Sequence, residues 1–179
     1  MLTGKKIVLG VSGGIAAYKM ANVASMLSKL HADIHVVMTE NATHFITPET
    51  FEVLTGNHCY TDTFDRCMEL HVPHIALGTQ ADAILIAPAS ADVVGKIANG
   101  IADDMLTTCV LPATCPVMLA PSMNVHMYEN PIVQDNMKKL VSYGYEIIEA
   151  DEGYLACRDI GKGKLPPEHV LVDYIIRAC

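Results

Sequence analysis

The first 38 residues carry the pattern of a strand, a tight loop, a helix and a second strand. Residues 7–11 form a short apolar run, and a Ser-Gly-Gly loop follows it. Residues 15–30 then place apolar side chains at helical spacing, and residues 34–38 are apolar again. Two neighbouring strands joined through a helix run parallel. The chain therefore begins with a βαβ unit, which favours an α/β fold.

The remainder of the chain continues this alternation. Apolar runs predict five strands, over residues 7–11, 34–38, 83–87, 116–120 and 145–148. Capping residues and helical spacing predict further helices over residues 48–54, 90–99, 103–111, 131–143 and 167–177. We therefore predict a single domain over residues 1–179. Its fold class is a doubly wound parallel sheet, Rossmann-like or flavodoxin-like, with helices on both faces.

Composition and charge argue against several classes of protein. Hydrophobic residues make up 51% of the chain and charged residues 18%, which is too apolar for a disordered chain. The formal net charge of −8 repels phosphates of nucleic acid, so no nucleic-acid partner is expected. No apolar run approaches the roughly 20 residues of a membrane span. The six cysteines lack metal-binding spacing. We expect a cytoplasmic protein with reduced thiols, no metal and no membrane contact.

Two motifs follow predicted strands, where ligands bind in sheets of this type. The loop Ser12-Gly13-Gly14 joins the first strand to the first helix, and its glycines let a phosphate come close to the backbone. Its spacing is not that of a dinucleotide fingerprint, and a turn built only for packing also explains it. The segment Ala87–Asp92 follows the most apolar strand. Its Ser90 and Asp92 either cap the next helix or help to hold a phosphate.

A third motif, residues 120–128, follows the next strand. Its Met123, Asn124 and Met127 suit a flat apolar ligand with one polar anchor. A turn with a structural asparagine is the alternative.

A histidine and a cysteine are candidates for proton transfer. His74, with His71 as a rival, is either a proton shuttle or a structural histidine. Cys157 lies in the glycine-rich and charged stretch 151–166, which we expect to be a surface loop able to act as a lid. Its thiol is either reactive or incidental.

Together these segments resemble the homo-oligomeric flavin-containing cysteine decarboxylases from about residue 5 to about residue 170. Members of that family carry His-Ile-x-Leu, Pro-Ala-Ser-Ala-Asn-Thr-like and Pro-x-Met-Asn-x-x-Met segments. This chain has matching segments at residues 74–77, 88–93 and 121–127. The flap motif Ala-Cys-x-Asp-x-Gly-x-Gly, which marks the phosphopantothenoylcysteine decarboxylases, matches residues 156–163. One departure is Asp92-Val93, which stands where the family often has Asn-Thr.

The resemblance implies FMN-dependent decarboxylation of 4′-phospho-N-pantothenoyl-L-cysteine to 4′-phosphopantetheine in coenzyme A biosynthesis, through a thioaldehyde and an enethiolate. It implies that His74 assists oxidation, Asn124 holds the substrate and Cys157 supplies a proton. It also implies a homo-oligomer, trimeric or dodecameric, with a flap over residues 151–166. The FMN-binding residues that it implies are Ser12, Gly13, Gly14, Thr39, Ser90, Ala91, Asp92, Val93 and Ser122. The substrate-binding residues are Met123, Asn124, Ala156 and Cys157.

Three rival functions remain. A lantibiotic-type peptidyl-cysteine decarboxylase and a flavin prenyltransferase both lack a counterpart of Cys157, and the prenyltransferase needs a dimethylallyl phosphate site. A non-catalytic flavin-binding regulatory subunit tends to carry a long acidic tail or to lose catalytic residues. Neither feature is found in this sequence.

Overall fold

The central sheet is the layer on which all other elements are placed. The computed structural model describes residues 1–64, 72–154 and 159–179. Six parallel strands lie in the order β3-β2-β1-β4-β5-β6. This is the order of a doubly wound sheet, with the change of direction between β1 and β4, so the predicted fold class is confirmed. The strands are β1 (Lys6–Val11), β2 (Asp33–Met38), β3 (Cys59–Tyr60), β4 (Ala83–Ala89), β5 (Val117–Pro121) and β6 (Glu146–Ile147).

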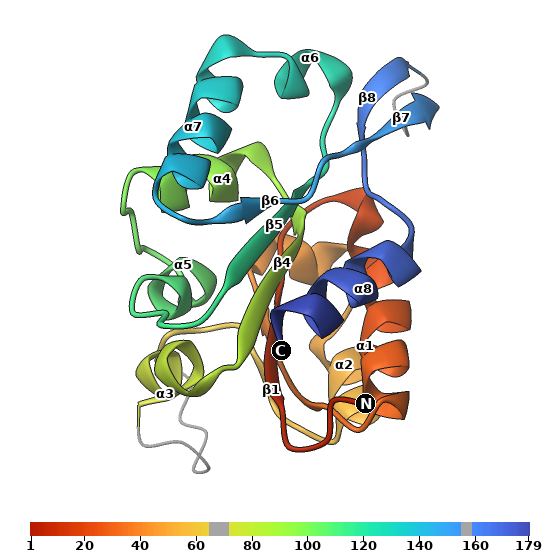
Figure 1. Cartoon of the computed structure of the whole chain (residues 1–179), viewed down its shortest axis with the longest axis vertical. Helices are drawn as coiled ribbons and strands as arrows, with labels where there is room; N and C mark the ends of the chain where they lie inside the picture. The colour runs from red at the N-terminus through yellow and green to blue at the C-terminus, as the bar shows by residue number, and fades with distance from the viewer. Residues whose placement is uncertain (65–71, 155–158) are drawn as a thin grey trace.

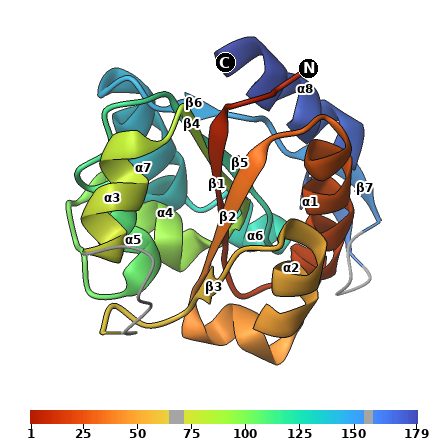
Figure 2. The same cartoon turned by 90° about the horizontal axis from the view of Figure 1, so that it is seen from below.

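Helices cover both faces of this sheet, as predicted (Figures 1 and 2). One face carries the 3-10 helix η1 (Ile15–Tyr18), α1 (Lys19–Lys29), α2 (Pro48–Thr55) and α8 (Glu168–Ala178). The other face carries α3 (Pro73–Gln80), α4 (Ala91–Ala98), α5 (Met105–Val110) and α7 (Pro131–Ser142). The remaining elements are η2 (Glu40–His44), α6 (Val125–Tyr128), β7 (Asp151–Tyr154) and β8 (Ile160–Lys164).

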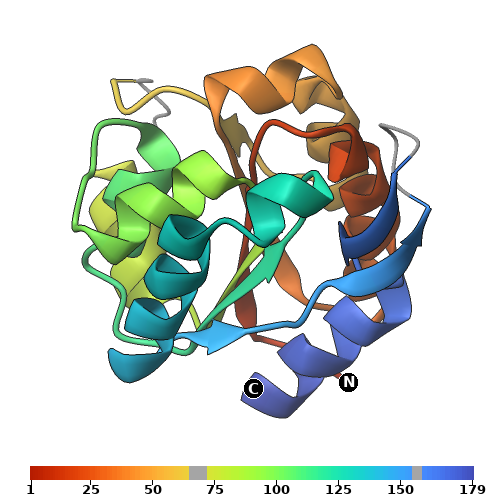
Figure 3. The same cartoon turned by 90° about the horizontal axis from the view of Figure 1, so that it is seen from above.

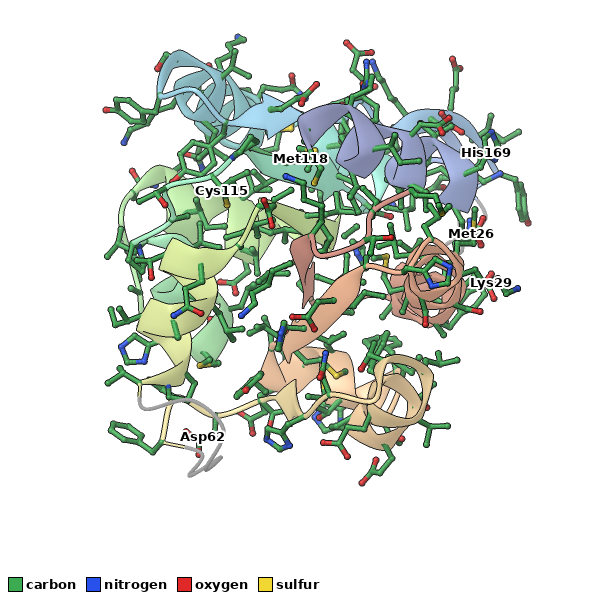
Figure 4. The ribbon with its side chains drawn as sticks, turned by 60° about the horizontal axis from the view of Figure 1, so that its bottom comes forward. Met26, Lys29, Asp62, Cys115, Met118 and His169 are labelled. Atoms are coloured by element: carbon green, nitrogen blue, oxygen red, sulfur yellow. The ribbon has the colours of Figure 1, made fainter. Side chains whose placement is uncertain are left out.

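The central strands are buried on both sides because their side chains alternate between the two helix layers. In β1, Leu9 belongs to the core beneath α1 and α8, whereas Val8 belongs to the core beneath α3, α4, α5 and α7. In β5, Met118 packs in the same core as the buried side of α8 (Figure 4). Burying each such side chain contributes about 1.5–3 kcal/mol. The two cores hold the carboxyl ends of the strands in fixed relative positions.

The structure refines three expectations from the sequence. The sheet has six strands rather than five, because β3 contains only two residues and is too short to show a strand period. The helix expected from residue 15 begins as a 3-10 turn and becomes α-helical at Lys19. The expected loop at 151–166 contains an antiparallel hairpin of β7 and β8. Most hairpin residues are not buried, so their sequence lacks an apolar alternation.

The short helices α3 and α6 were not predicted from the sequence. Helix α3 packs closely on α5 through Gly78, which is buried. A Cβ on Gly78 would overlap the backbone oxygen of Cys109 and lie 2.9 Å from Cγ of Pro112. A side chain at this position would therefore push α3 away from α5.

We predict opposite effects of the same substitution at two helical glycines. Gly78→Ala should lower the free energy of unfolding by about 1–3 kcal/mol through overpacking. Gly95→Ala in α4, whose Cβ would be 3.6 Å from the nearest atom, should raise it by up to about 1 kcal/mol. Urea unfolding of both variants checks this. A Gly78→Ala protein as stable as the wild type would contradict the packing described for α3.

Candidate functional site

The carboxyl ends of β1 and β4 are joined through one buried hydroxyl group. Ser12, at the end of β1, is fully buried. Its Oγ donates to the carbonyl oxygen of Pro88 at 2.6 Å and accepts from the backbone N–H of Ser90 at 2.9 Å. The backbone N–H of Ser12 also donates to the Pro88 oxygen, at 3.3 Å. These bonds fix the glycine loop against the loop before α4, at the change of direction in the sheet where ligands bind in this class of fold.

A cavity of about 480 Å³ opens above this junction. Figure 3 looks onto this end of the molecule, with α6 lying over the middle of the sheet. Five segments form the cavity wall: the loop after β1, the first turn of α1, the start of α4, the loop after β5, and the hairpin. The residues of these segments that matter below are Gly13, Gly14, Tyr18, Lys19, Ser90, Ala91, Ser122, Met123, Asn124, Met127, Tyr154, Gly163 and Lys164.

The charge of the cavity wall is opposite to that of the chain. Among the described residues, the lining includes two lysines, Lys19 and Lys164, and no aspartate or glutamate, although the chain carries a net charge of −8. Within the part of the chain that the structure describes, neither lysine is in an ion pair. Unpaired cations in a cleft concentrate anions there. The cavity therefore favours an anionic ligand.

The two loop glycines have different roles. A Cβ on Gly13 would lie 2.5 Å from Cβ of Asn41, so this glycine allows η2 to pack against the loop. A Cβ on Gly14 would meet only Pro88, at 3.9 Å, on the wall of the cavity. The packing explanation therefore fits Gly13, whereas Gly14 leaves space for a ligand beside the backbone.

Helix α4 begins at the cavity wall. Its N-cap, Ser90, accepts a hydrogen bond from the backbone N–H of Val93 at 3.3 Å. Ser90 and Ala91 line the cavity. Backbone N–H groups in the first turn of a helix have no partner within the helix and attract anions. Ser90 can therefore cap α4 while the first turn of the same helix binds a phosphate.

Asn124 is held in one orientation by its neighbours. Its Oδ1 accepts from the backbone N–H of His126 at 2.8 Å, and its Nδ2 donates to Oδ2 of Asp159 at 2.9 Å. The hairpin is docked on the same segment, because the N–H of Met123 donates to the oxygen of Gly163 at 3.0 Å. A Cβ on Gly163 would overlap the oxygen of Met123. The hairpin therefore positions the amide of Asn124 at the cavity wall.

Most of the candidate residues that the structure describes meet at this cavity. Those that line it are Gly13, Gly14, Ser90, Ala91, Ser122, Met123 and Asn124. Ser12, Thr39 and Val93 are buried, and the side chain of Thr39 caps η2 by accepting from the N–H of Ala42 at 3.3 Å. The side chain of Asp92 forms an ion pair with Lys96. Ala156 and Cys157 lie outside the described residues.

His74 does not line the cavity, and neither does any other residue of α3. It stands on the first turn of α3, which lies far from α6 and the hairpin in Figure 1. Its Nδ1 is buried and has no hydrogen-bond partner among the described residues. Within a single chain, His74 therefore cannot contact a ligand in this cavity.

Several cavity residues were missed from the sequence. Tyr18, Lys19, Tyr154 and Lys164 line the wall, but single tyrosines and lysines give no pattern in a sequence. Asp159 was also missed as a partner of Asn124, although it is the aspartate of the flap motif. Its place in that motif, two residues after Cys157, is the signal that could have identified it.

Two buried cysteines lie away from the cavity. Burial raises the pKa of the Cys59 and Cys109 thiols to about 12, so they remain protonated and unreactive near neutral pH. The described residues contain no group of three or more side chains able to hold a metal ion. No helix in the described ranges is both long and apolar enough to cross a membrane.

Comparison with known proteins places the chain in a family. The Flavoprotein family matches residues 1–179, so the chain belongs to it. It is 49% identical over 172 residues to the coenzyme A biosynthesis bifunctional protein CoaBC of Bacillus subtilis, covering 96% of this chain and 42% of that protein. It is 42% identical to the probable phosphopantothenoylcysteine decarboxylase of Streptococcus mutans, covering 96% and 97%. The chain thus spans less than half the length of the bifunctional relatives that it matches.

Two solved structures are similar over nearly the whole chain. The FMN-dependent cysteine decarboxylase SpaF has 35% identity and a TM-score of 0.85, with 99% of each chain covered. A cysteine-to-serine mutant of PPC decarboxylase, in complex with pantothenoylaminoethenethiol, has 28% identity and a TM-score of 0.87, with 97% of each chain covered. These likenesses agree with the fold and with the resemblance inferred from the motifs.

We predict that Ser12 and Ser122 contribute differently to stability. Ser12→Ala should lower the free energy of unfolding by about 1–3 kcal/mol, because it leaves the backbone N–H of Ser90 without its partner and removes one of the two hydrogen bonds to the Pro88 oxygen. Ser122→Ala is the matched control on the cavity wall and should change it by less than about 0.5 kcal/mol. Equal effects in urea unfolding would contradict the bridging role of Ser12.

Proposed function

We propose that this chain is an FMN-dependent decarboxylase of 4′-phospho-N-pantothenoyl-L-cysteine. The observation that carries the proposal is a cavity at the change of sheet direction that combines N–H groups, the lysines Lys19 and Lys164, which form no ion pair with the described residues, and the oriented amide of Asn124. The cofactor and the substrate are both phosphorylated, and the substrate also carries a carboxylate. The similarity to a full-length phosphopantothenoylcysteine decarboxylase supports the same activity.

The cavity residues fit a flavin mononucleotide. Gly14 and the start of α4 suit its phosphate. Met123, Met127 and Tyr18 offer apolar and aromatic surface for a flat ring. When bound, FMN supplies the means to accept a hydride from the substrate and later to return it.

The reaction needs a site for the electron pair that is left when carbon dioxide departs. Saturated cysteine offers none. Oxidation of its CH2–SH group to a thioaldehyde creates one, β to the carboxylate, and loss of carbon dioxide then gives an enethiolate. Protonation of carbon and reduction restore the oxidation level, so the overall reaction requires no external reductant.

Asn124 is the residue that we assign to the substrate carboxylate. Its amide is fixed by Asp159 and by the N–H of His126, at 2.9 and 2.8 Å, so the amide does not need to reorient when substrate arrives. Preorganised donors of this kind favour one bound geometry. Cys157, which lies outside the described residues, is assigned the proton donated to the enethiolate.

We assign the base for the oxidation step to His74 of a second copy of the chain. His74 is not on the cavity wall of its own chain. Val72 and Ile75, two residues before it and one residue after it in the chain, have exposed apolar side chains. Exposed apolar groups of this kind are typical of an interface between subunits. A homo-oligomer, trimeric or dodecameric, is the assembly that we propose.

The reducing cytoplasm is the proposed location. The described cysteines Cys59, Cys109, Cys115 and Cys179 are all free thiols, which suits that compartment.

The assigned roles predict separable defects. His74→Asn should block oxidation, whereas Cys157→Ser should oxidise and decarboxylate the substrate but accumulate the enethiolate. Absorbance spectra and mass spectrometry after a single turnover distinguish the two. Normal product formation by Cys157→Ser would remove its role, and purified protein that neither contains nor binds FMN would overturn the proposed function.

Mixed oligomers test the shared site. Co-expressed His74→Asn and Cys157→Ser subunits should regain part of the wild-type rate, because some sites combine an intact His74 with an intact Cys157 from different copies. No recovery in oligomers shown to contain both subunits would place both groups of each site in one chain.

Lys164 should recognise the phosphate of the substrate. Lys164→Met should raise KM about tenfold for the phosphorylated substrate, since a hydrogen bond to a charged group contributes about 1.5–3 kcal/mol. It should leave KM for unphosphorylated pantothenoylcysteine unchanged. Lys162→Met is the matched control, since Lys162 instead pairs with Glu149 at 2.9 Å. Equal changes for both substrates would contradict this assignment.

The peptidyl-cysteine decarboxylase is the second candidate. SpaF, an FMN-dependent cysteine decarboxylase with a similar structure, favours it, whereas Cys157 in the flap motif and the lysines of the cavity favour a phosphorylated small molecule. Parallel assays with a peptide ending in cysteine and with phosphopantothenoylcysteine decide between them. A flavin-binding regulatory subunit would turn over neither.

A further inference from the structure

Lys96 is the centre of a charge cluster on α4. Its Nζ lies 3.3 Å from Asp92, 3.0 Å from Asp103 and 3.4 Å from Asp104. The Lys96 side chain is only 22% exposed, whereas that of Asp92 is 64% exposed. The hydrogen bond to Asp103 is the largest of several effects that raise the pKa of Lys96, so this group stays protonated. One partly buried cation thus forms ion pairs with three carboxylates.

The cluster lies next to the turn where a phosphate is expected. Asp92 is the second residue of α4, directly after Ala91, which lines the cavity. Asp92 itself does not line the cavity. Its partner is four residues further along the helix, so the ion pair draws the carboxylate towards the C-terminal end of α4.

A carboxylate in the first turn of α4 weakens the binding of a phosphate at the N-terminus of that helix. Both are anions, and both are attracted by the positive end of the helix. Asp92, Asp103 and Asp104 carry three negative charges, and Lys96 reduces the sum to −2. Coulomb's law with a dielectric constant close to that of water gives about a three- to tenfold weaker binding of a phosphate dianion when one positive charge about two helical turns away is removed.

We propose that Lys96 is a positioning residue that makes Asp92 compatible with phosphate binding at the start of α4. It offsets part of the negative charge beside the phosphate position and holds the Asp92 carboxylate on the side of the helix away from the cavity. Lys96 thereby contributes to the preference for FMN over riboflavin, which has the same ring but no phosphate. This inference rests on the proposed function, because it takes FMN to be the cofactor.

The test is titration of the full chain, freed of flavin, with FMN and with riboflavin, followed by flavin fluorescence. At low ionic strength, Lys96→Met should weaken FMN binding about three- to tenfold and change riboflavin binding less than twofold. The double variant with Asp92→Asn should regain most of the lost FMN affinity. Added salt should reduce the effect, because it screens partly exposed charges.

Two further variants control for folding and for total charge. Lys96→Arg keeps the charge and should retain FMN affinity. Lys139→Met removes one positive charge from α7, where Lys139 contacts Asn99 rather than a carboxylate, and should leave FMN affinity unchanged. Circular dichroism establishes that each variant is folded.

The possible results distinguish a failure of the role of Lys96 from a failure of the proposed function. Equal losses for FMN and riboflavin in Lys96→Met, or no loss for FMN, overturn the role of Lys96 while leaving a flavin-binding protein. Failure of Asp92→Asn to restore FMN affinity overturns it as well. A wild-type chain that binds neither flavin overturns the proposed function itself.

Discussion

A single hydroxyl group joins the two halves of the sheet at the point where a ligand is expected. Ser12 is fully buried, and its hydroxyl group donates to the carbonyl of Pro88 and accepts from the N–H of Ser90. Because a buried polar group is costly without partners, this pair of bonds favours one arrangement of the two loops. The glycine loop and the start of α4 are therefore presented to the cavity as one rigid surface. The placement of Gly14, Ser90 and Ala91 depends on it.

The second wall of the cavity is built by docking rather than by the sheet. The hairpin of β7 and β8 packs on the segment after β5, with backbone contact between Gly163 and Met123 and a hydrogen bond from Asn124 to Asp159. Glycine is needed at position 163 because its φ of 142° and the nearby carbonyl leave little freedom for a side chain. The arrangement joins a rigid floor of strand ends to a wall that belongs to a separate element.

The sequence was sufficient for the fold and for much of the cavity. Parallel strands buried on both faces, such as Ala83–Ala89, produce long apolar runs that are easily recognised. Motifs at the ends of those strands therefore converged as expected, at Gly14, Ser90 and Asn124. The short strand Cys59–Tyr60 and the exposed hairpin were missed because neither has a period of apolar residues. Lys19 and Lys164 were missed because charge in a cavity depends on which distant segments meet, and no local pattern records that. The distance of His74 from the cavity was equally invisible in the sequence.

The docking of the hairpin has a consequence for how such a site diverges. The same two strands carry Tyr154 on the cavity wall and Gly163 against the backbone of Met123. A substitution selected to admit a larger or uncharged molecule beneath the hairpin would also be felt by the amide of Asn124, through Asp159. Substrate specificity and the orientation of the Asn124 amide therefore depend on the same hairpin. A new specificity is more readily reached by exchanging the whole hairpin than by single substitutions within it.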